Sequence, residues 1–131
     1  LDDRAMELLE SVDLAGFADT VTAEMPYGRK RALEIATTLA LEPKMMLLDE
    51  PTQGMGSEDI ARVVDLIRKV SANRTILMVE HNLSVVANLC DRITVLTRGS
   101  VLAEGSYAEV SKNPKVLEAY VGSDDIADAH H

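Results

Sequence analysis

The sequence predicts an α/β protein with a largely parallel sheet flanked by helices, and two apolar runs carry that prediction. Residues 45–51 read MMLLDEP, an apolar run that ends abruptly in two carboxylates and a proline. Residues 76–81 read ILMVEH, a second run of the same kind. A half-buried strand alternates polar and apolar residues, whereas a continuous run is typical of a strand covered on both faces. Ligands bind at the carboxyl ends of such strands, so the polar residues there are site candidates.

The N-terminal third predicts two helices joined by an irregular connection. Asp2 or Asp3 is suited to cap a first helix that runs to about Val12. Residues 15–27 have no clear periodicity. A second helix is expected from about Gly28 to Leu41, where Pro43 stops it.

The remainder predicts alternating strands and helices that end in a hairpin. Ser57 is expected to cap a third helix, with Glu58 and Asp59 favourably placed in its first turn. Arg98, Gly99 and Ser100 indicate a hairpin turn. The expected strands are 44–49, 75–79, 93–96 and 101–103, the later helices are 83–89, 108–111 and 114–120, and 123–131 is a disordered polar tail.

Composition excludes several classes of protein. The chain has 131 residues, enough for one domain with a core, and a net charge of −9, which argues against a nucleic-acid partner. No run approaches the roughly 18 apolar residues of a membrane span. The single Cys90 cannot form an internal disulfide, which suits a reducing cytosol. We interpret it as a small core residue.

Asp49 and Glu50 form the strongest chemical signal. Adjacent carboxylates repel each other, so a cation is expected beside them. In phosphoryl-transfer sites that cation is Mg²⁺, held by the first acid, while the second polarises the attacking water. The alternative is a strand that ends in a solvated acidic turn.

A basic helix start is the second signal. Residues 29–31 read RKR and follow Tyr27 and Gly28. Helix N-termini with a flanking glycine are ready-made anion sites, so this segment invites a phosphate. The alternative is a solvated cluster paired with local acids such as Glu24 and Glu34.

Four segments in order resemble the ABC-type ATPases. Residues 25–29 (MPYGR) lie where that family has its signature loop, 45–51 match its Walker B strand, 54–57 (GMGS) its D-loop and 78–82 (MVEHN) its H-loop. The chain is most similar to the ATPases of branched-chain amino acid importers, through these segments, LEIA at 33–36 and the ending NPKVLEAYVG at 113–122.

The resemblance implies that residues 1–122 are the C-terminal half of an ABC-type P-loop ATPase domain. Residues 1–43 would end the helical subdomain with its signature loop, and 44–122 would carry the Walker B, D-loop and H-loop half. No G-x-x-x-x-G-K-[ST] stretch is present, so the phosphate loop is expected before residue 1 and this fragment alone is expected to be inactive.

The resemblance also assigns roles and cofactors, ATP and Mg²⁺. Glu50 and His81 would be catalytic, His81 by hydrogen-bonding the γ-phosphate, and Asp49 would bind the metal. The residues expected to contact nucleotide across a subunit interface are Pro26, Tyr27, Gly28, Arg29 and Gly56.

Four positions depart from the usual family pattern. The signature serine is Pro26 here, as in the branched-chain importer group, and the glutamine is Arg29. The arginine three positions later is Ala32, and the D-loop aspartate is Gly56. These differences concern contacts across subunits more than the hydrolytic carboxylate.

The expected function is the ATP-hydrolysing subunit of an importer for branched-chain or similar amino acids. Its partners would be a second ATPase subunit and transmembrane permease subunits, at the cytoplasmic face of the plasma membrane. A soluble ABC protein of translation or DNA repair, and a non-catalytic interaction fragment, are the alternatives. The isolated fragment is expected to self-associate through the strand at 44–49, whose edge would lack a partner.

Overall fold

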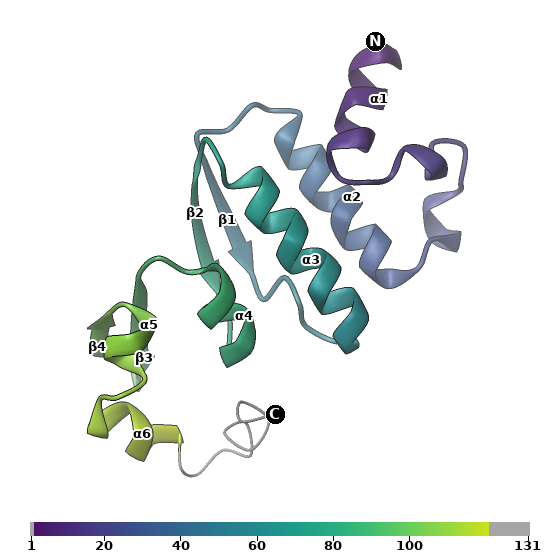
Figure 1. Ribbon diagram of the computed structural model, residues 1–131. Coiled ribbons are helices and arrows are strands. Elements are labelled where there is room, and N and C mark those ends of the chain that lie inside the picture. The colour runs from purple at the N-terminus through teal and green to yellow at the C-terminus, as the bar shows by residue number, and fades with distance from the viewer. Residues whose placement is uncertain (1, 121–131) are drawn as a thin grey trace. The chain divides into compact units, whose positions relative to one another are not determined.

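The computed structural model describes residues 2–120, which form two compact units, 2–79 and 80–120. Figure 1 draws the elements of both units, and each unit is considered by itself. No helix in this range combines the length and the apolar character needed to cross a bilayer.

The first unit contains three helices and two strands. Its elements are α1 (Asp2–Ser11), α2 (Tyr27–Leu39), β1 (Met45–Asp49), α3 (Ser57–Val70) and β2 (Thr75–Val79). The connection predicted to be irregular contains two short 3-10 turns, at Ala15–Phe17 and Thr22–Glu24. Helix α2 ends two residues earlier than predicted, because the chain turns at Glu42, which adopts a left-handed φ of 51°.

Strands β1 and β2 pair in parallel, which confirms the predicted sheet direction. The register runs from Met45 opposite Thr75 to Asp49 opposite Val79, and α3 is the crossover between the strands. One detail at α3 was wrong. Gly56, with extended backbone, is the N-cap, and Ser57 is already the first helical residue, so no side chain caps this helix.

The prediction that the strand at 44–49 is covered on both faces is wrong for the described residues. Met46 is 1% exposed, whereas Leu47 is 71% exposed and Leu77, opposite it on β2, is 56% exposed. Helices α2 and α3 contact each other and form one layer against the sheet (Figure 1). Because a single helical layer covers only one face, the alternate residues of both strands stay open to solvent.

The second unit is a helix followed by a hairpin and two short helices. Its elements are α4 (Leu83–Leu89), β3 (Ile93–Thr97), β4 (Ser100–Gly105), α5 (Tyr107–Val110) and α6 (Pro114–Tyr120). β3 and β4 are antiparallel, and the turn has left-handed φ angles of 48° at Arg98 and 78° at Gly99. These features confirm the predicted hairpin and short helices. The predicted tail at 123–131 lies outside the described residues.

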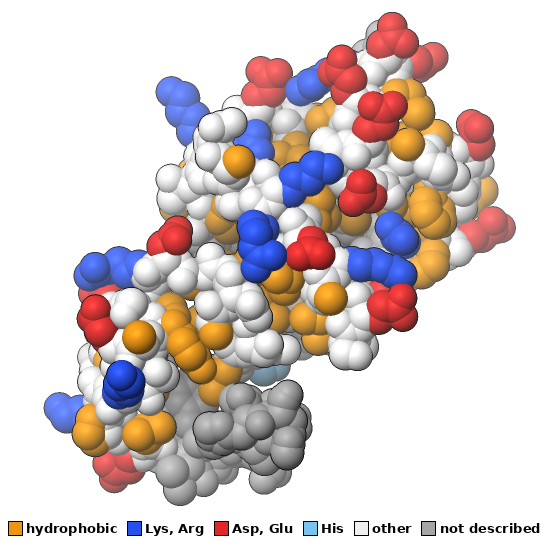
Figure 2. Space-filling model, in the orientation of Figure 1, with side chains coloured by type: hydrophobic (Ala, Val, Ile, Leu, Met, Phe, Trp, Pro, Cys, Tyr) orange, Lys and Arg blue, Asp and Glu red, His pale blue; other side chains and the backbone are white. Residues whose placement is uncertain are grey.

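The surface carries acidic and basic side chains side by side. On the face drawn in Figure 2, Lys and Arg side chains lie among Asp and Glu side chains, with apolar side chains between them. This face therefore has no purely basic patch of the kind that grips a phosphate backbone.

Candidate functional site

The two candidate carboxylates lie at the carboxyl end of β1. Asp49 is the last residue of the strand and is exposed. Glu50 leaves the strand with a left-handed φ of 44°, and its amide donates a hydrogen bond to the Val79 carbonyl oxygen over 2.8 Å. Left-handed backbone costs a non-glycine residue on the order of 1 kcal/mol or more and persists where the surroundings impose it. The bond to β2 thus holds Glu50 in a strained turn.

The loop after Glu50 is tied down by its own backbone. The Gln53 amide donates to the Glu50 carbonyl oxygen over 3.1 Å, and the Met55 amide donates to that of Thr52 over 3.3 Å. Pro51 and Thr52 are buried. The predicted D-loop segment therefore runs from an anchored turn directly into α3, with exposed Gly56 as the N-cap.

The candidate signature segment forms the start of α2. Pro26 is its N-cap, and the Pro26 carbonyl oxygen accepts hydrogen bonds from the amides of Arg29 and Lys30, both over 3.0 Å. Met25 is buried, while Pro26 and Tyr27 are exposed. A proline has no hydroxyl to cap the helix, and no side-chain cap is present here.

Two of the three cations at this helix start are held by the preceding loop. Arg29 Nη1 donates to the Asp13 carbonyl oxygen over 3.5 Å, and its guanidinium lies 5.5 Å from the centre of the Phe17 ring. Lys30 Nζ donates to the Ala23 carbonyl oxygen over 3.2 Å. These contacts fasten the loop at 13–25 to α2.

The third cation, Arg31, pairs within its own helix. Its Nη1 lies 2.9 Å from Glu34 Oε2, its Nη2 donates to the Tyr27 hydroxyl over 3.2 Å, and its guanidinium lies 5.9 Å from the centre of the Tyr27 ring. The alternative of local pairing thus holds for Arg31 and Glu34. What remains for an incoming anion is chiefly the backbone at the start of α2.

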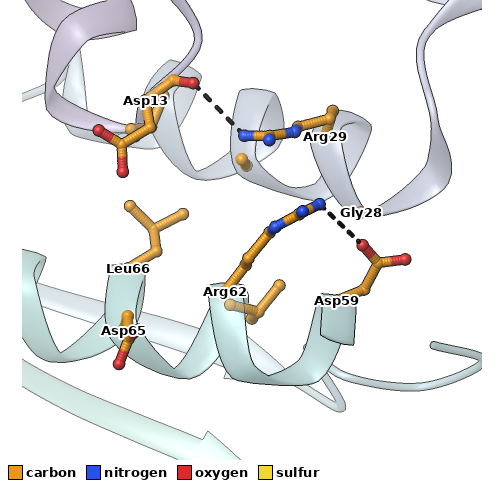
Figure 3. Close-up of a pocket in the computed structure, with 10 residues that line it drawn as sticks. Asp13, Gly28, Arg29, Asp59, Arg62, Asp65 and Leu66 are labelled. Atoms are coloured by element: carbon orange, nitrogen blue, oxygen red, sulfur yellow. Dashed lines mark hydrogen bonds and ion pairs between the residues drawn. The ribbon is translucent and has the colours of Figure 1, made fainter. Parts of the chain in front are cut away.

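That backbone lies against an acidic side chain of α3. A Cβ atom built on Gly28 would lie 2.9 Å from Asp59 Cγ and 3.0 Å from Asp59 Oδ1. Arg62 Nη1 in turn lies 3.6 Å from Asp59 Oδ1. Figure 3 shows these residues around a hollow of about 250 Å³ that Arg29 and Asp13 also line. The sequence showed Asp59 only as a first-turn acid, because its contact with Gly28 is made by tertiary packing.

The structure therefore brings most of the predicted site residues into the first unit. They lie at the start of α2, the end of β1 and the N-cap of α3: Pro26, Tyr27, Gly28, Arg29, Asp49, Glu50 and Gly56. In residues 2–120 no three His, Cys, Asp or Glu side chains gather as a metal-binding cluster.

His81 belongs to the second unit, in the turn that leads into α4. Its side chain is exposed. The Asn82 amide donates to Glu80 Oε2 over 3.3 Å, and Asn82 Oδ1 accepts from the Val85 amide over 3.2 Å. His81 thus lies between two residues that fix the start of the helix.

Cys90 follows the same helix and is half-buried. Burial raises the pKa of its thiol, and the negative charges of Asp91 and Glu80 raise that pKa further. The neutral thiol is therefore favoured, which agrees with a packing role rather than a reactive one.

Two protein families match parts of the chain. The family described as ABC transporter matches residues 1–53. The family described as branched-chain amino acid ATP-binding cassette transporter matches residues 100–126. The two matches lie at opposite ends of the chain.

Curated relatives match most of the chain. The high-affinity branched-chain amino acid transport ATP-binding protein LivG of Salmonella typhimurium is 36% identical over 122 residues, which are 92% of this chain and 48% of LivG. BraF of Pseudomonas aeruginosa, of the same description, is 35% identical over 90% of this chain and 47% of its own. The methionine import ATP-binding protein MetN 1 of Shouchella clausii is 33% identical over 86% and 33%. The chain thus spans about half the length of the branched-chain relatives.

Solved structures agree in fold. The ADP conformation of MJ1267, an ATP-binding cassette of an ABC transporter, superposes with a TM-score of 0.85 at 30% identity, over 92% of this chain and 50% of that one. A nucleotide-free ATP-binding cassette from an ABC transporter gives a TM-score of 0.79 at 29% identity, over 92% and 50%.

Proposed function

Because the chain is homologous to the ATP-binding proteins of ABC transporters over most of its length, we propose that it forms the C-terminal half of an ABC ATPase domain. In this proposal residues 1–43 end the helical subdomain and 44–122 carry the hydrolytic carboxylate. The glycine-rich phosphate loop comes from outside the 131 residues, and the chain alone is inactive.

The conformation of Glu50 is the observation that carries the proposal. Its carboxylate follows Asp49 at the end of a parallel strand, and a hydrogen bond from its own amide to Val79 holds the turn that presents it. A strained backbone held by its neighbour at a sheet edge is typical of a functional position rather than of a solvated acidic turn.

In the proposed reaction the two carboxylates have separate tasks. Exposed Asp49 binds Mg²⁺, which keeps most of its water ligands because no three potential ligands gather in residues 2–120. Glu50 polarises the water that attacks the γ-phosphate of ATP. His81 holds that phosphate through its imidazole, which both donates and accepts hydrogen bonds.

We also propose that the start of α2 faces nucleotide held by a second ATPase subunit. Pro26 and Tyr27 are exposed there, and Gly28 lets the helix start be approached closely. Arg29 acts indirectly, because its guanidinium is occupied by Asp13 and Phe17. Gly56 contributes from the N-cap of α3.

The transported cargo is proposed to be an amino acid, with branched-chain side chains favoured. The names of LivG and BraF and the family match at 100–126 support that substrate class, and MetN 1 supports an amino acid more generally. Transmembrane permease subunits would then hold the domain at the cytoplasmic face of the membrane. All of these relatives are named for transport, which disfavours a role in translation or DNA repair.

We further propose that the 131-residue chain self-associates through its open sheet face. The exposed apolar side chains of Met45, Leu47, Leu77 and Val79 alternate along β1 and β2 on that face. Contiguous apolar surface of this kind favours association with another copy in water.

The substitution Glu50→Gln tests the proposed chemistry in a protein that carries this chain together with a phosphate loop. ATP binding should persist, while hydrolysis should fall at least about 100-fold, the scale of lost acid–base assistance. Glu42→Gln is the matched control, because Glu42 also has a left-handed φ and loses the same charge outside the site. Near-normal turnover in Glu50→Gln would remove Glu50 from the catalytic role.

A further inference from the structure

The geometry points to Asp59 as a charge gate that sets how tightly a phosphate binds the start of α2. This inference rests on the proposed role of residues 25–29 in contacting nucleotide. It adds a residue from another helix, outside every motif in the sequence, and assigns it a sign: Asp59 weakens phosphate binding, and Arg62 moderates that effect.

The first step is the distance between the two helices. Gly28 lies in the first turn of α2, and its missing side chain lets the Asp59 carboxyl group approach to where a Cβ would be 2.9 Å from Cγ. A carboxylate there interacts favourably with the partial positive charge of the helix N-terminus. The protein therefore supplies its own anion at the end of α2 that is proposed to receive a phosphate.

The second step is the balance of charge around that carboxylate. Arg62, one turn further along α3, places Nη1 3.6 Å from Asp59 Oδ1, while its Nη2 lies 2.7 Å from Glu58 Oε1. Arg62 is thus shared between two acids and neutralises Asp59 only in part. Arg29 lines the same hollow but is directed to the Asp13 carbonyl oxygen (Figure 3).

The consequence is a competition at the start of α2. A phosphate that approaches Tyr27 and Gly28 meets the negative charge of Asp59 as well as the helix N-terminus. Neutralising Asp59 should strengthen phosphate binding, and removing Arg62 should weaken it. A purely structural contact between the helices predicts no such opposite signs, because both substitutions would then loosen the same packing.

The test uses the 131-residue chain with inorganic pyrophosphate as the probe. Amide NMR shifts of Tyr27 and Gly28 report binding during titration. Asp59→Asn, which keeps the shape of the side chain, should lower the apparent Kd about three- to tenfold, the scale of one unit charge a few ångströms away in a solvated site. Arg62→Gln should raise the apparent Kd, and it should have less effect when Asp59 is already Asn.

Asp65→Asn is the matched control. Asp65 lines the same hollow from the same helix and loses the same charge, but it pairs with Arg68 over 3.2 Å instead of facing Gly28. Its apparent Kd should change less than that of Asp59→Asn. Equal shifts in both variants would show that only net charge matters and would overturn the gate.

The remaining outcomes separate this inference from the proposed function. Saturable shifts at Tyr27 and Gly28 that are the same with Asp59 and Asn would keep the phosphate site and refute the gate. No shift at these amides in any variant would refute the phosphate site and the gate together. Amide spectra of each variant without pyrophosphate show whether the fold is kept.

Discussion

Met46→Ala, compared with Met45→Ala, tests the conclusion that only one face of the β1–β2 pair is covered. The two methionines are neighbours in the same strand, so strand propensity and the chemical change are the same. Met46 is 1% exposed and Met45 is 50% exposed. Any difference in the cost of the two substitutions therefore measures burial.

The expected magnitudes follow from that burial. Truncation of methionine to alanine removes Cγ, Sδ and Cε, worth about 2.4 kcal/mol of transfer free energy when all are buried. At Met46 the enclosed cavity adds to this, for a total of about 3 kcal/mol. At Met45 half of the transfer term is already lost to solvent and no closed cavity forms, so about 1 kcal/mol is expected.

Urea titration followed through amide NMR resonances of the first unit measures both free energies of unfolding. Resonances of that unit are needed because the two units of the chain need not unfold together. Low micromolar protein keeps self-association out of the measurement. Equal losses for the two variants would mean that both faces of the strand are covered in solution and would refute the one-layer architecture.

Three further predictions concern association, chemistry at Cys90 and a helix cap. Leu47→Lys should shift light scattering of concentrated protein toward monomer, with or without Mg-ATP, since it puts a charge on the open sheet face; a chain that is monomeric before substitution would contradict the proposed association. Because the folded-state pKa of Cys90 is raised, its alkylation by iodoacetamide should reach half-maximal rate at higher pH than a free cysteine, and its contribution to stability should be complete below the unfolded pKa and lost as pH rises through the folded pKa; a midpoint at the free-cysteine pH would be inconsistent with its burial. Asn82→Ala should cost about 1 kcal/mol by removing the acceptor of the Val85 amide, measured by hydrogen exchange in α4, whereas Asn82→Asp should retain most of it.

Most elements were predictable because their signals are local. The β-branched run at 75–79 and the helix at 83–89 have the bounds that were expected. The glycine turn at 98–100 predicts its hairpin through backbone preferences alone, and the left-handed φ of Gly99 agrees. The cap of α3 was missed because serine and the preceding glycine are both acceptable caps, so the choice depended on one backbone dihedral.

The site was predictable in composition but not in environment. Asp49 and Glu50 were identified as candidates because adjacent acids at a strand end are chemically unusual. The partners of Arg29, a carbonyl oxygen and a ring contributed by the preceding loop, have no sequence signal. The same is true of the carboxylate that Asp59 places against Gly28.

The sequence by itself determined the order of elements, the parallel pair and the family, because hydrophobic periodicity, turn residues and short motifs act over a few neighbouring positions. Tertiary structure alone decided which face of β1 is buried, since an apolar run is compatible with one covering layer or two. It also decided the electrostatics at the start of α2. Charge interactions depend on distances between residues from different helices, and packing rather than sequence spacing sets those distances.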